Sequence, residues 1–405
     1  MRYDAAIIGA GPAGAASAIH LARAGQRVVL VDRSMFPRDK PCAEYLSPAA
    51  EPLLRQLGVD DLLAEACPNR LRGFRIFAPG GRMFQGDFSA TRGSDGESLY
   101  ETGLVLPRGR LDAAIVAGAR RAGAEVREGW RAGQVERIAG GYRVHPVGGA
   151  EPVDARLLVA ADGVHSTVAR RLGLHMPSRM RKIALVAHIR GITDLSAYGE
   201  MHVAGRRYVG IAPLEPGARD ALCNVAMVVD ERRDGPDIAG RAERYLLDAL
   251  ETFPGLSGRV GHLSVERRTL TISRLCVHSR RLSGEHLLLV GDATGYYDPF
   301  TGEGIYRALR GAQLVAVVAL PALASNTLGS ATLAAYDRLQ RETFRGKRMV
   351  EHIIQFAVQA PPLMDHIARR LARHKAMADT IVAVTGDFLP ASAVLRPGYL
   401  LRLVV

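Results

Sequence analysis

The sequence contains little cysteine. Of its 405 residues only Cys42, Cys67, Cys223 and Cys276 are cysteines, and no two of them have the spacing of a metal-binding pair. A chain of this length can bury a large core without disulfide bonds. The composition therefore favours a reducing, cytoplasmic environment, excludes a disulfide-stabilised secreted domain, and leads us to expect no metal site.

Long apolar runs are also missing. The longest, such as QLVAVVALPALA at residues 313–324, are short and contain proline, so no transmembrane helix is predicted. The first residues lead directly into a predicted strand, and we expect no signal peptide.

Acidic residues are fewer than basic ones, 41 against 53, which gives a formal net charge of +12. The arginines are scattered singly or stand in doublets such as Arg120–Arg121, without the aromatic-interleaved stripe of a nucleic-acid site. We therefore expect no nucleic-acid partner. A weak attraction for anionic substrates or lipid headgroups stays open.

What the sequence does contain is a complete βαβ unit near its start. Residues 3–8 are apolar and predict a buried strand, residues 13–24 predict an alanine-rich helix ended by Gly25, and a second strand ends at Asp32. A G-x-G-x-x-G motif forms the turn between the first strand and the helix. This unit predicts a Rossmann-type dinucleotide site.

Each glycine of the motif has a mechanical role. Gly9 permits the tight turn, Gly11 lets the backbone approach a pyrophosphate, and Gly14 allows close packing of helix on strand. The helix N-terminus offers N–H groups to the anion, and Asp32 would accept hydrogen bonds from an adenosine ribose. The motif by itself does not distinguish FAD from NAD.

Later segments make that distinction. A buried strand runs into Asp162–Gly163, and another runs into Gly291–Asp292, followed by the loop DPFTGEGI and a helix beginning near Gly302. A third segment, LPRGRLDAAIVAGARRAGAEV, occupies residues 106–126. We expect the strand ends to converge on one extended nucleotide.

In order and spacing, these segments resemble motifs of the FAD-dependent oxidoreductases built like aromatic hydroxylases, the group that also contains geranylgeranyl reductases and flavin halogenases. The resemblance covers about residues 1–345. It implies FAD as cofactor and an α/β fold, in which a Rossmann-type FAD-binding domain is interleaved with a mostly antiparallel β-sheet substrate domain and followed by a C-terminal helical cap.

The resemblance also implies the residues that contact FAD. They are Gly9, Gly11, Pro12, Ala13, Gly14, Asp32, Arg33, Cys42, Arg108, Val126, Asp162, Gly163, Asp292, Pro299, Gly302, Gly304 and Ile305. In this set Arg108 reaches the diphosphate or ribityl region, and Asp292 bonds a ribityl hydroxyl. The helix starting near Gly304 points its positive end at the flavin, which carries negative charge when reduced.

The segment RDKPCAEYLSP resembles the family's R-x-K-x-C-G element, with Ala43 in place of the glycine. The element implies that this loop crosses in front of the flavin. We interpret Cys42 as a compact residue lining the site, with a thiolate activated by Lys40 and Arg38 as the alternative. Tyr45 lines the substrate side or serves only in packing.

Alternating segments predict the substrate sheet. They are FRIFAPGGRMFQG, KIALVAHIRG, RRYVGIAPL, LCNVAMVVD and SVERRTLTI. The stretch YVGIAPLEPG is similar to the Y-x-W-x-F-P element of geranylgeranyl reductases: Tyr208 and Pro213 match and are assigned to the substrate wall. Gly210 and Ala212 replace large aromatic residues, which enlarges the pocket or suits another substrate and counts against a strict isoprenoid reductase. The halogenase element W-x-W-x-I-P is absent, and we expect no halogenation.

The predicted domains are interleaved along the chain. Residues 1–70, 107–177 and 283–340 are assigned to the FAD-binding domain, 71–106 and 178–282 to the substrate domain, and 341–405 to a helical C-terminal segment. Helix breaks are expected at Pro361–Pro362 and at Gly386. We expect this segment to cap the FAD-binding domain; a peripheral membrane contact and a dimer interface are the alternatives.

The resemblance implies an oxidoreductase in which the flavin carries the chemistry, so no catalytic side chain is nominated. The favoured hypothesis is a monooxygenase of secondary metabolism that uses O2, through a flavin C4a-hydroperoxide, to hydroxylate an electron-rich aromatic or polyketide-like molecule. The alternative is a reductase or dehydrogenase acting on C–C bonds of a hydrophobic, isoprenoid substrate. Without a second dinucleotide motif, NAD(P)H would dock transiently, or a separate reductase would supply electrons.

Overall fold

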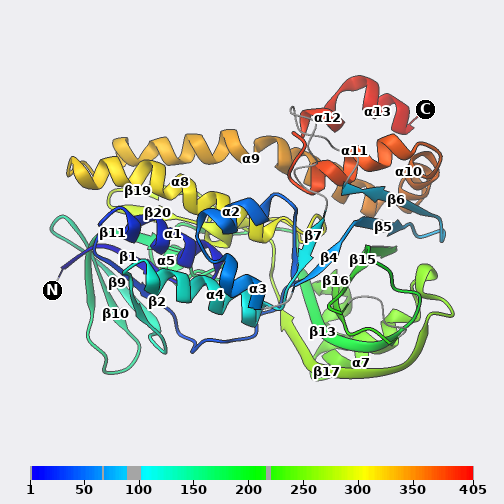
Figure 1. Ribbon diagram of the computed structural model, residues 1–405, viewed down its shortest axis with the longest axis horizontal. Coiled ribbons are helices and arrows are strands. Elements are labelled where there is room, and N and C mark those ends of the chain that lie inside the picture. The colour runs from blue at the N-terminus through cyan, green and yellow to red at the C-terminus, as the bar shows by residue number, and fades with distance from the viewer. Residues whose placement is uncertain (1, 66–67, 89–101, 216–219, 405) are drawn as a thin grey trace.

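The computed structural model describes residues 2–65, 68–88, 102–215 and 220–404. Two main sheets organise these residues, one on the left and one on the right of Figure 1. Helices α8 (Gly304–Ala324) and α9 (Ser330–Gln359) run along the upper side of the left sheet, and the last helices lie above the right one.

The left sheet is built mainly from the segments predicted to bind the dinucleotide. β1 (Arg2–Ile8) pairs in parallel with β2 (Val28–Val31) on one side and with β11 (Val153–Ala160) on the other. The order of its eight strands is β19 (Ser283–Gly284), β20 (Leu287–Leu289), β11, β1, β2 and β8 (Glu125–Arg127), with β10 (Gly141–Pro146) on β11 and β9 (Ala132–Ile138) on β10. Because helices and the β9–β10 hairpin cover it, the central strands read as continuous apolar runs.

Helices pack on this sheet and on one another, beginning with α1 (Pro12–Arg23), which follows β1 directly. α1 packs against α8 and against α4 (Arg108–Arg121). The shorter helices are α2 (Ala50–Gln56), α3 (Asp60–Glu65) and α5 (Thr167–Arg171). Within the described ranges α8 alone is long and apolar enough to cross a membrane, yet more than half of that stretch is buried in the fold. Its packing on α1 and α9 is that of a core helix.

The right sheet joins the two predicted insertions. Its seven strands follow the order β17 (Val260–Ile272), β13 (Lys182–Ile192), β16 (Cys223–Asp230), β15 (Arg207–Pro213), β14 (Gly199–Ala204), β5 (Gly73–Phe77) and β6 (Met83–Asp87). Every neighbouring pair is antiparallel except β14 with β5. One face packs on α6 (Glu231–Ile238), α7 (Ala242–Leu250) and η2 (Pro254–Leu256). The fold class predicted from the sequence is thereby confirmed.

Two small sheets connect these units. One contains β3 (Tyr45–Leu46), β7 (Gly103–Val105) and β4 (Asn69–Leu71). The other contains β12 (His175–Pro177), β18 (Val277–Ser279) and β21 (Gly295–Tyr296), and η3 (Gly291–Thr294) directly precedes β21. Both sheets contribute residues to one cavity, Tyr45 from the first sheet and Tyr296 from the second.

The C-terminal helices differ from the expectation. α9 lies on α8, but α10 (Pro361–Arg373) and α11 (Lys375–Thr385) pack on β6 of the right sheet. α12 (Ser392–Leu395) and α13 (Pro397–Val404) complete the segment. A Cβ at Gly86 would lie 2.6 Å from the Ala378 carbonyl oxygen, so the glycine permits this close contact. The predicted breaks at Pro361 and Gly386 are confirmed, whereas the prediction of a cap on the FAD-binding domain is wrong for α10 and α11.

Candidate functional site

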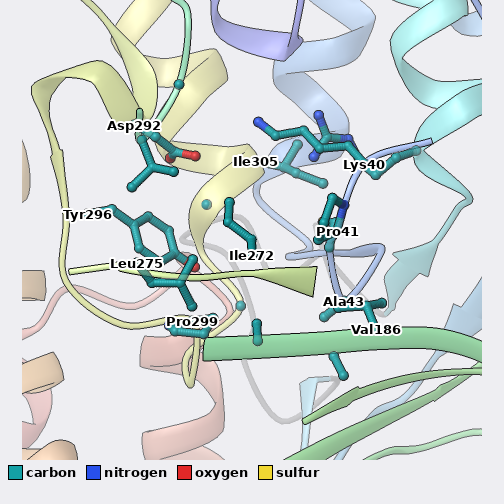
Figure 2. A pocket seen from close by; sticks show the side chains of 18 of the residues that line it. Lys40, Pro41, Ala43, Val186, Ile272, Leu275, Asp292, Tyr296, Pro299 and Ile305 are labelled. Carbon is teal, nitrogen blue, oxygen red and sulfur yellow. The ribbon is translucent and has the colours of Figure 1, made fainter. Parts of the chain in front are cut away.

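A deep cavity lies where the two main sheets meet. Its empty space, including the part that is open to solvent, is about 1190 Å³. The loops after β1, β11 and β20 form its upper wall, and β13, β15 and β16 form its floor. Figure 2 shows Asp292, Tyr296 and Pro299 on one side, Lys40 on the other, and Val186 from the floor.

The glycine motif leaves no room for side chains where helix meets strand. Gly9 has a φ of +101°, and a Cβ there would lie 2.5 Å from the carbonyl oxygen of Ala161. A Cβ at Gly14 would lie 1.8 Å from the carbonyl oxygen of Gly9. These contacts set α1 directly against the ends of β1 and β11 and aim its N-terminus at the cavity.

Gly11 is different, because it faces open space. The nearest atoms to a Cβ at Gly11 would be the guanidinium nitrogens of Arg38, at 3.8 Å, and Arg108, at 4.0 Å. Gly11 is also the N-cap of α1, and no side chain caps that helix. Uncapped N–H groups, a vacant Cβ position and two guanidinium groups together match the size and charge of a pyrophosphate. These residues therefore fit a dinucleotide such as FAD.

Beside the N-terminus of α1, the buried carboxylate of Asp112 holds the guanidinium groups of Arg108 and Arg38. Arg108 donates two hydrogen bonds of 2.8 Å to Asp112, and Arg38 lies 3.2 Å from the same carboxylate. Burial acts to lower the pKa of Arg108, but Asp112 outweighs it and the pKa is raised. The pKa of Lys40 is lowered by burial and by Arg108. The cluster favours an anionic ligand over a cationic one.

Asp32 lies at the end of β2, as predicted. Its carboxylate accepts hydrogen bonds from the backbone N–H groups of Ala10, at 2.7 Å, and Ser34, at 2.9 Å. These bonds hold the glycine loop beside the strand, and a carboxylate retains further lone pairs for a ribose. Val126 on β8 pairs with Leu30 beside this point, and Arg33 is exposed. Their contacts with an adenosine stay predictions.

The opposite end of the cavity is formed by the N-terminus of α8. Pro299, Gly302, Gly304 and Ile305 line it together with Asp292 of η3. No protein atom lies within 4 Å of a Cβ built at Gly304. A flat ring could therefore contact the backbone at the positive end of this 21-residue helix.

The loop that carries these residues is anchored by Asp298, which sequence reasoning missed. The buried Asp298 accepts hydrogen bonds from the Tyr208 hydroxyl, at 2.6 Å, and from the Phe300 N–H, at 3.0 Å. It also pairs with Lys182 on β13 and with Gln355 on α9. Burial and Asp298 raise the pKa of Tyr208 well above its ordinary value, so its hydroxyl acts as a hydrogen-bond donor that ties the loop to the floor.

Glu44 is a second residue that the sequence analysis did not select. It is fully buried and accepts hydrogen bonds from the Arg108 N–H at 3.0 Å, Arg267 at 2.8 Å, His188 at 2.6 Å and the Asn224 amide at 2.8 Å. The side-chain donors lie 144 to 223 residues away in the chain. No local pattern could have identified them, because only the tertiary structure brings them to Glu44.

Glu44 also fixes the loop that contains Cys42. The Glu44 N–H donates to the Cys42 sulfur at 3.3 Å, and the Asn224 amide donates to the Cys42 carbonyl at 3.0 Å. The half-buried Cys42 lines the cavity and lies beside Arg108. This placement agrees with the interpretation of Cys42 as a lining residue.

The floor carries small and apolar side chains. Its lining residues are Ala184, Val186, Met201, Tyr208, Gly210, Ala226, Val228, Ile272 and Leu275. Tyr45 also lines the cavity, and its ring packs edge-on against Phe74 with centroids 4.9 Å apart. Its contact with a substrate stays a prediction. Gly210 lies in the floor. Pro213, which was assigned to the substrate wall, is not among the described residues that line the cavity. Its carbonyl accepts a hydrogen bond of 2.8 Å from the Asn69 amide.

Asp162 lies outside the lining of the cavity, which includes its neighbours Ala161, Gly163 and Val164. Its carboxylate accepts hydrogen bonds from the Ser166 hydroxyl at 2.5 Å and from the Thr167 N–H at 2.6 Å. It therefore holds the first N–H groups of α5, whose N-cap residue is Ser166, and its place near the pyrophosphate stays a prediction.

Glu303 lies just behind the α8 N-terminus. It is buried, and neither of its carboxylate oxygens has a hydrogen-bond partner among the described residues. Burial and the neighbouring Asp387 raise its pKa to about 8; Glu351 acts in the same direction, and Lys347 and Arg307 oppose them. At neutral pH this carboxyl group therefore holds its proton.

We expect Glu303→Gln to be more stable than wild type at pH 8. The pKa of Glu303 is 4.5 in its ordinary state and about 8 in the folded chain. Between these two pH values the unfolded chain ionises Glu303 while the folded chain keeps it protonated. The free energy of unfolding of wild type therefore falls as pH rises through this window. The midpoint of thermal unfolding at pH 8 should rise by on the order of 2 °C or more. Thermal melts between pH 4.5 and 8.5 measure this.

The matched control is Glu285→Gln. Glu285 forms an exposed ion pair with Arg137, which lowers its pKa, so its replacement should bring no gain at pH 8. A lower unfolding midpoint for Glu303→Gln at pH 8 would contradict the assignment of a buried, protonated carboxyl group.

Comparisons with known proteins agree with this geometry. The sequence pattern of a family described as "FAD binding domain" matches residues 2–351. Conditioned medium factor receptor 1 of Dictyostelium discoideum is 27% identical over 98% of this chain and 79% of that protein. Digeranylgeranylglycerophospholipid reductase 1 of Methanothermobacter thermautotrophicus is 30% identical over 84% of this chain and 82% of that protein. Menaquinone reductase of Mycobacterium tuberculosis is 30% identical over 77% of this chain and 75% of that protein.

Solved structures share the fold at lower identity. A flavoprotein/dehydrogenase from Cytophaga hutchinsonii has a TM-score of 0.80 at 18% identity, with 95% of this chain and 93% of that chain covered. The halogenase PltM in complex with phloroglucinol and FAD has a TM-score of 0.76 at 17% identity, with 99% of this chain and 85% of that chain covered.

Proposed function

Because the chain belongs to the FAD-binding-domain family of flavoproteins, we propose that it is a FAD-dependent reductase that saturates C=C bonds in the polyprenyl chain of a lipid. The glycine motif, Asp32 and Arg108 would hold the ADP half of FAD. Asp292 and the start of α8 would hold the flavin end, with Cys42 and Tyr45 beside the ring.

The observation that carries this proposal is the floor of the cavity. Among the described residues that line it, β13, β14, β15 and β16 contribute only apolar side chains and Tyr208, whose hydroxyl already bonds Asp298. A phenol or other polar aromatic would lose hydrogen bonds to water here without replacement. A polyprenyl chain loses none, and the small residues Ala184, Gly210 and Ala226 leave it room.

Two named relatives support the same substrate class. The reductases of digeranylgeranylglycerophospholipid and of menaquinone, at 30% identity, are named for isoprenoid lipids. The halogenases share the fold at 17 to 23% identity, which carries no argument about the reaction. The monooxygenase that we favoured from sequence stays a prediction, and the apolar floor favours the reductase over it.

The chain's own residues would prepare the site for reduction. When bound and reduced, with NAD(P)H as the proposed electron donor, FAD would supply a hydride to one carbon of the C=C bond, and a proton from solvent would add to the other carbon. Lys40, Arg108 and the positive end of α8 would stabilise the negative charge of the reduced ring. The apolar floor would hold the alkene over the ring and exclude water, while the Asp298 anchor keeps the ring-binding loop in place.

An anaerobic reduction assay tests the proposal. FAD-loaded protein is reduced with dithionite and mixed with a detergent-dispersed phospholipid that carries geranylgeranyl chains. We expect flavin reoxidation and a lipid whose mass increases by one H2 per bond reduced. Ala226→Phe should lower the rate at least about tenfold with unchanged flavin absorbance, because its ring would fill the floor beside β16. A product that contains oxygen from O2 and forms only in air would establish the monooxygenase instead.

A further inference from the structure

Three large apolar side chains project from one side of α9 into solvent. Met349, Ile353 and Phe356 are 49%, 39% and 69% exposed. Their spacing of four and then three residues places them on one helical face, which we call the α9 stripe. Other exposed large apolar side chains, such as Met35, Val147 and Val317, stand on separate elements. A contiguous apolar row on a surface marks an interaction site.

The stripe is held outward by the opposite face of the same helix. On that face Lys347, Glu351 and Gln355 are buried. Lys347 pairs with Asp387, Glu351 accepts a bond of 2.9 Å from Arg307, and Gln355 bonds Asp298. Rotating α9 to bury the stripe would break all three contacts, and each would leave a polar group unpaired in the interior. The exposure is therefore a fixed property of the fold.

Cations precede the stripe along α9. Along the exposed side of α9 leading to it stand Arg338, Arg341 and Arg345, with Glu342 as the acidic residue among them. α13, which packs on α12 and lies at the upper right in Figure 1, carries the 63% exposed Leu401 and the exposed Arg402. An apolar row with basic residues beside it has the composition of a helix that lies in a bilayer surface.

The stripe is also next to the cavity wall. The His352 ring, on the same exposed side as Ile353, stacks on Tyr297 with centroids 4.2 Å apart. The Tyr297 carbonyl accepts a hydrogen bond of 2.9 Å from the Cys276 thiol. Their chain neighbours Tyr296 and Leu275 line the cavity. His352 thus joins the exposed side of α9, through Tyr297, to two segments that line the cavity.

We propose that the α9 stripe, with Leu401 and the neighbouring arginines, docks the protein on an anionic lipid bilayer. The docking itself follows from the surface; the further step, that a lipid substrate enters the cavity from this bilayer past Tyr297, rests on the proposed function. Apolar side chains would insert among the acyl chains while the guanidinium groups pair with phosphates.

Vesicle flotation of the full-length, FAD-loaded protein tests this. Wild type should float with vesicles of phosphatidylcholine and phosphatidylglycerol in equal parts, less with phosphatidylcholine alone, and less in high salt. Ile353→Ser with Phe356→Ser should weaken the affinity for anionic vesicles at least about tenfold. Val147→Ser is the matched control, because Val147 is 60% exposed but lies beyond β10, far from α9 in the chain; its affinity should equal that of wild type. Flavin absorbance and the far-ultraviolet circular dichroism confirm that each variant is folded.

Two outcomes would overturn the proposal. One is a flotation result: wild type stays in the soluble fraction, or the double variant floats as well as wild type does. The other is light scattering in which wild type is a dimer and the double variant a monomer, with vesicle binding unchanged, since the stripe would then be an interface between two copies. Flotation needs no turnover, and the reduction assay uses detergent instead of vesicles. Loss of docking therefore leaves the reductase assignment intact, and loss of reduction leaves the docking intact.

Discussion

Gly11→Val is expected to give a folded protein that retains no FAD. The isopropyl group would occupy the open space over the α1 N-terminus, where the nearest protein atoms to a Cβ lie 3.8 Å away. Valine therefore meets little protein, but it takes the place assigned to the pyrophosphate and blocks approach to the N–H groups. After gel filtration of protein refolded with FAD, the flavin absorbance should fall at least about a hundredfold, the consequence of losing roughly 3 kcal/mol or more of cofactor binding.

Gly329→Val is the matched control for this result. Gly329 is also a helix N-cap with an extended backbone, its φ is −69°, and a Cβ there meets no atom within 4 Å. It lies at the start of α9, away from the cavity lining as described. This variant should keep its flavin. Equal flavin content in both variants would refute the placement of the dinucleotide over Gly11.

Glu44→Gln is expected to lower the free energy of unfolding by about 3 kcal/mol, the usual cost of breaking a buried charged network. The amide carries no charge to offset Arg267, and its NH2 group would face the donors His188 and Asn224. For a chain of 405 residues the midpoint of thermal unfolding should fall by roughly 3–4 °C. Because the network ties the Cys42 loop to the floor, the flavin spectrum should shift as well.

The pH dependence of this loss has a definite sign. Burial acts to raise the pKa of Glu44, but His188 and Arg267 outweigh it, and the pKa lies below its ordinary value of 4.5. The stabilisation by the ionised carboxylate is thus complete above pH 4.5 and is lost as pH falls through the lower, folded-state pKa. The difference between wild type and Glu44→Gln should shrink in that acid range and stay constant above it.

Glu215→Gln provides the comparison for Glu44→Gln. Glu215 makes two hydrogen bonds of 2.8 Å with Arg190, but its side chain is 43% exposed. Solvent screening leaves such a pair worth about 0–1 kcal/mol. If the two variants lose the same free energy of unfolding, the Glu44 network is not the link between the Cys42 loop and the right sheet that its contacts indicate.

The sequence by itself determined the dinucleotide half of this protein. Gly9, Gly11 and Gly14 follow a predicted strand at fixed spacing, and Asp32 ends the next strand, so local geometry alone dictates a tight turn into α1 of the kind that is typical of dinucleotide sites. The alternating apolar segments likewise predicted the strands of the right sheet. The breaks at Pro361 and Gly386 followed from the restricted backbone of proline and from glycine at a helix end.

Only the tertiary structure decided how those parts serve a site. Glu44 and Asp298 are single acids in unremarkable local sequence, and their partners come from strands and helices more than fifty residues away. Asp162 matched a family motif, yet its carboxylate holds the first N–H groups of α5. α10 and α11 pack on β6, where Gly86 permits a close approach of α11. Periodicity fixes which face of an element is apolar, whereas long-range packing fixes what that face meets, and the second cannot be read from neighbours in the chain.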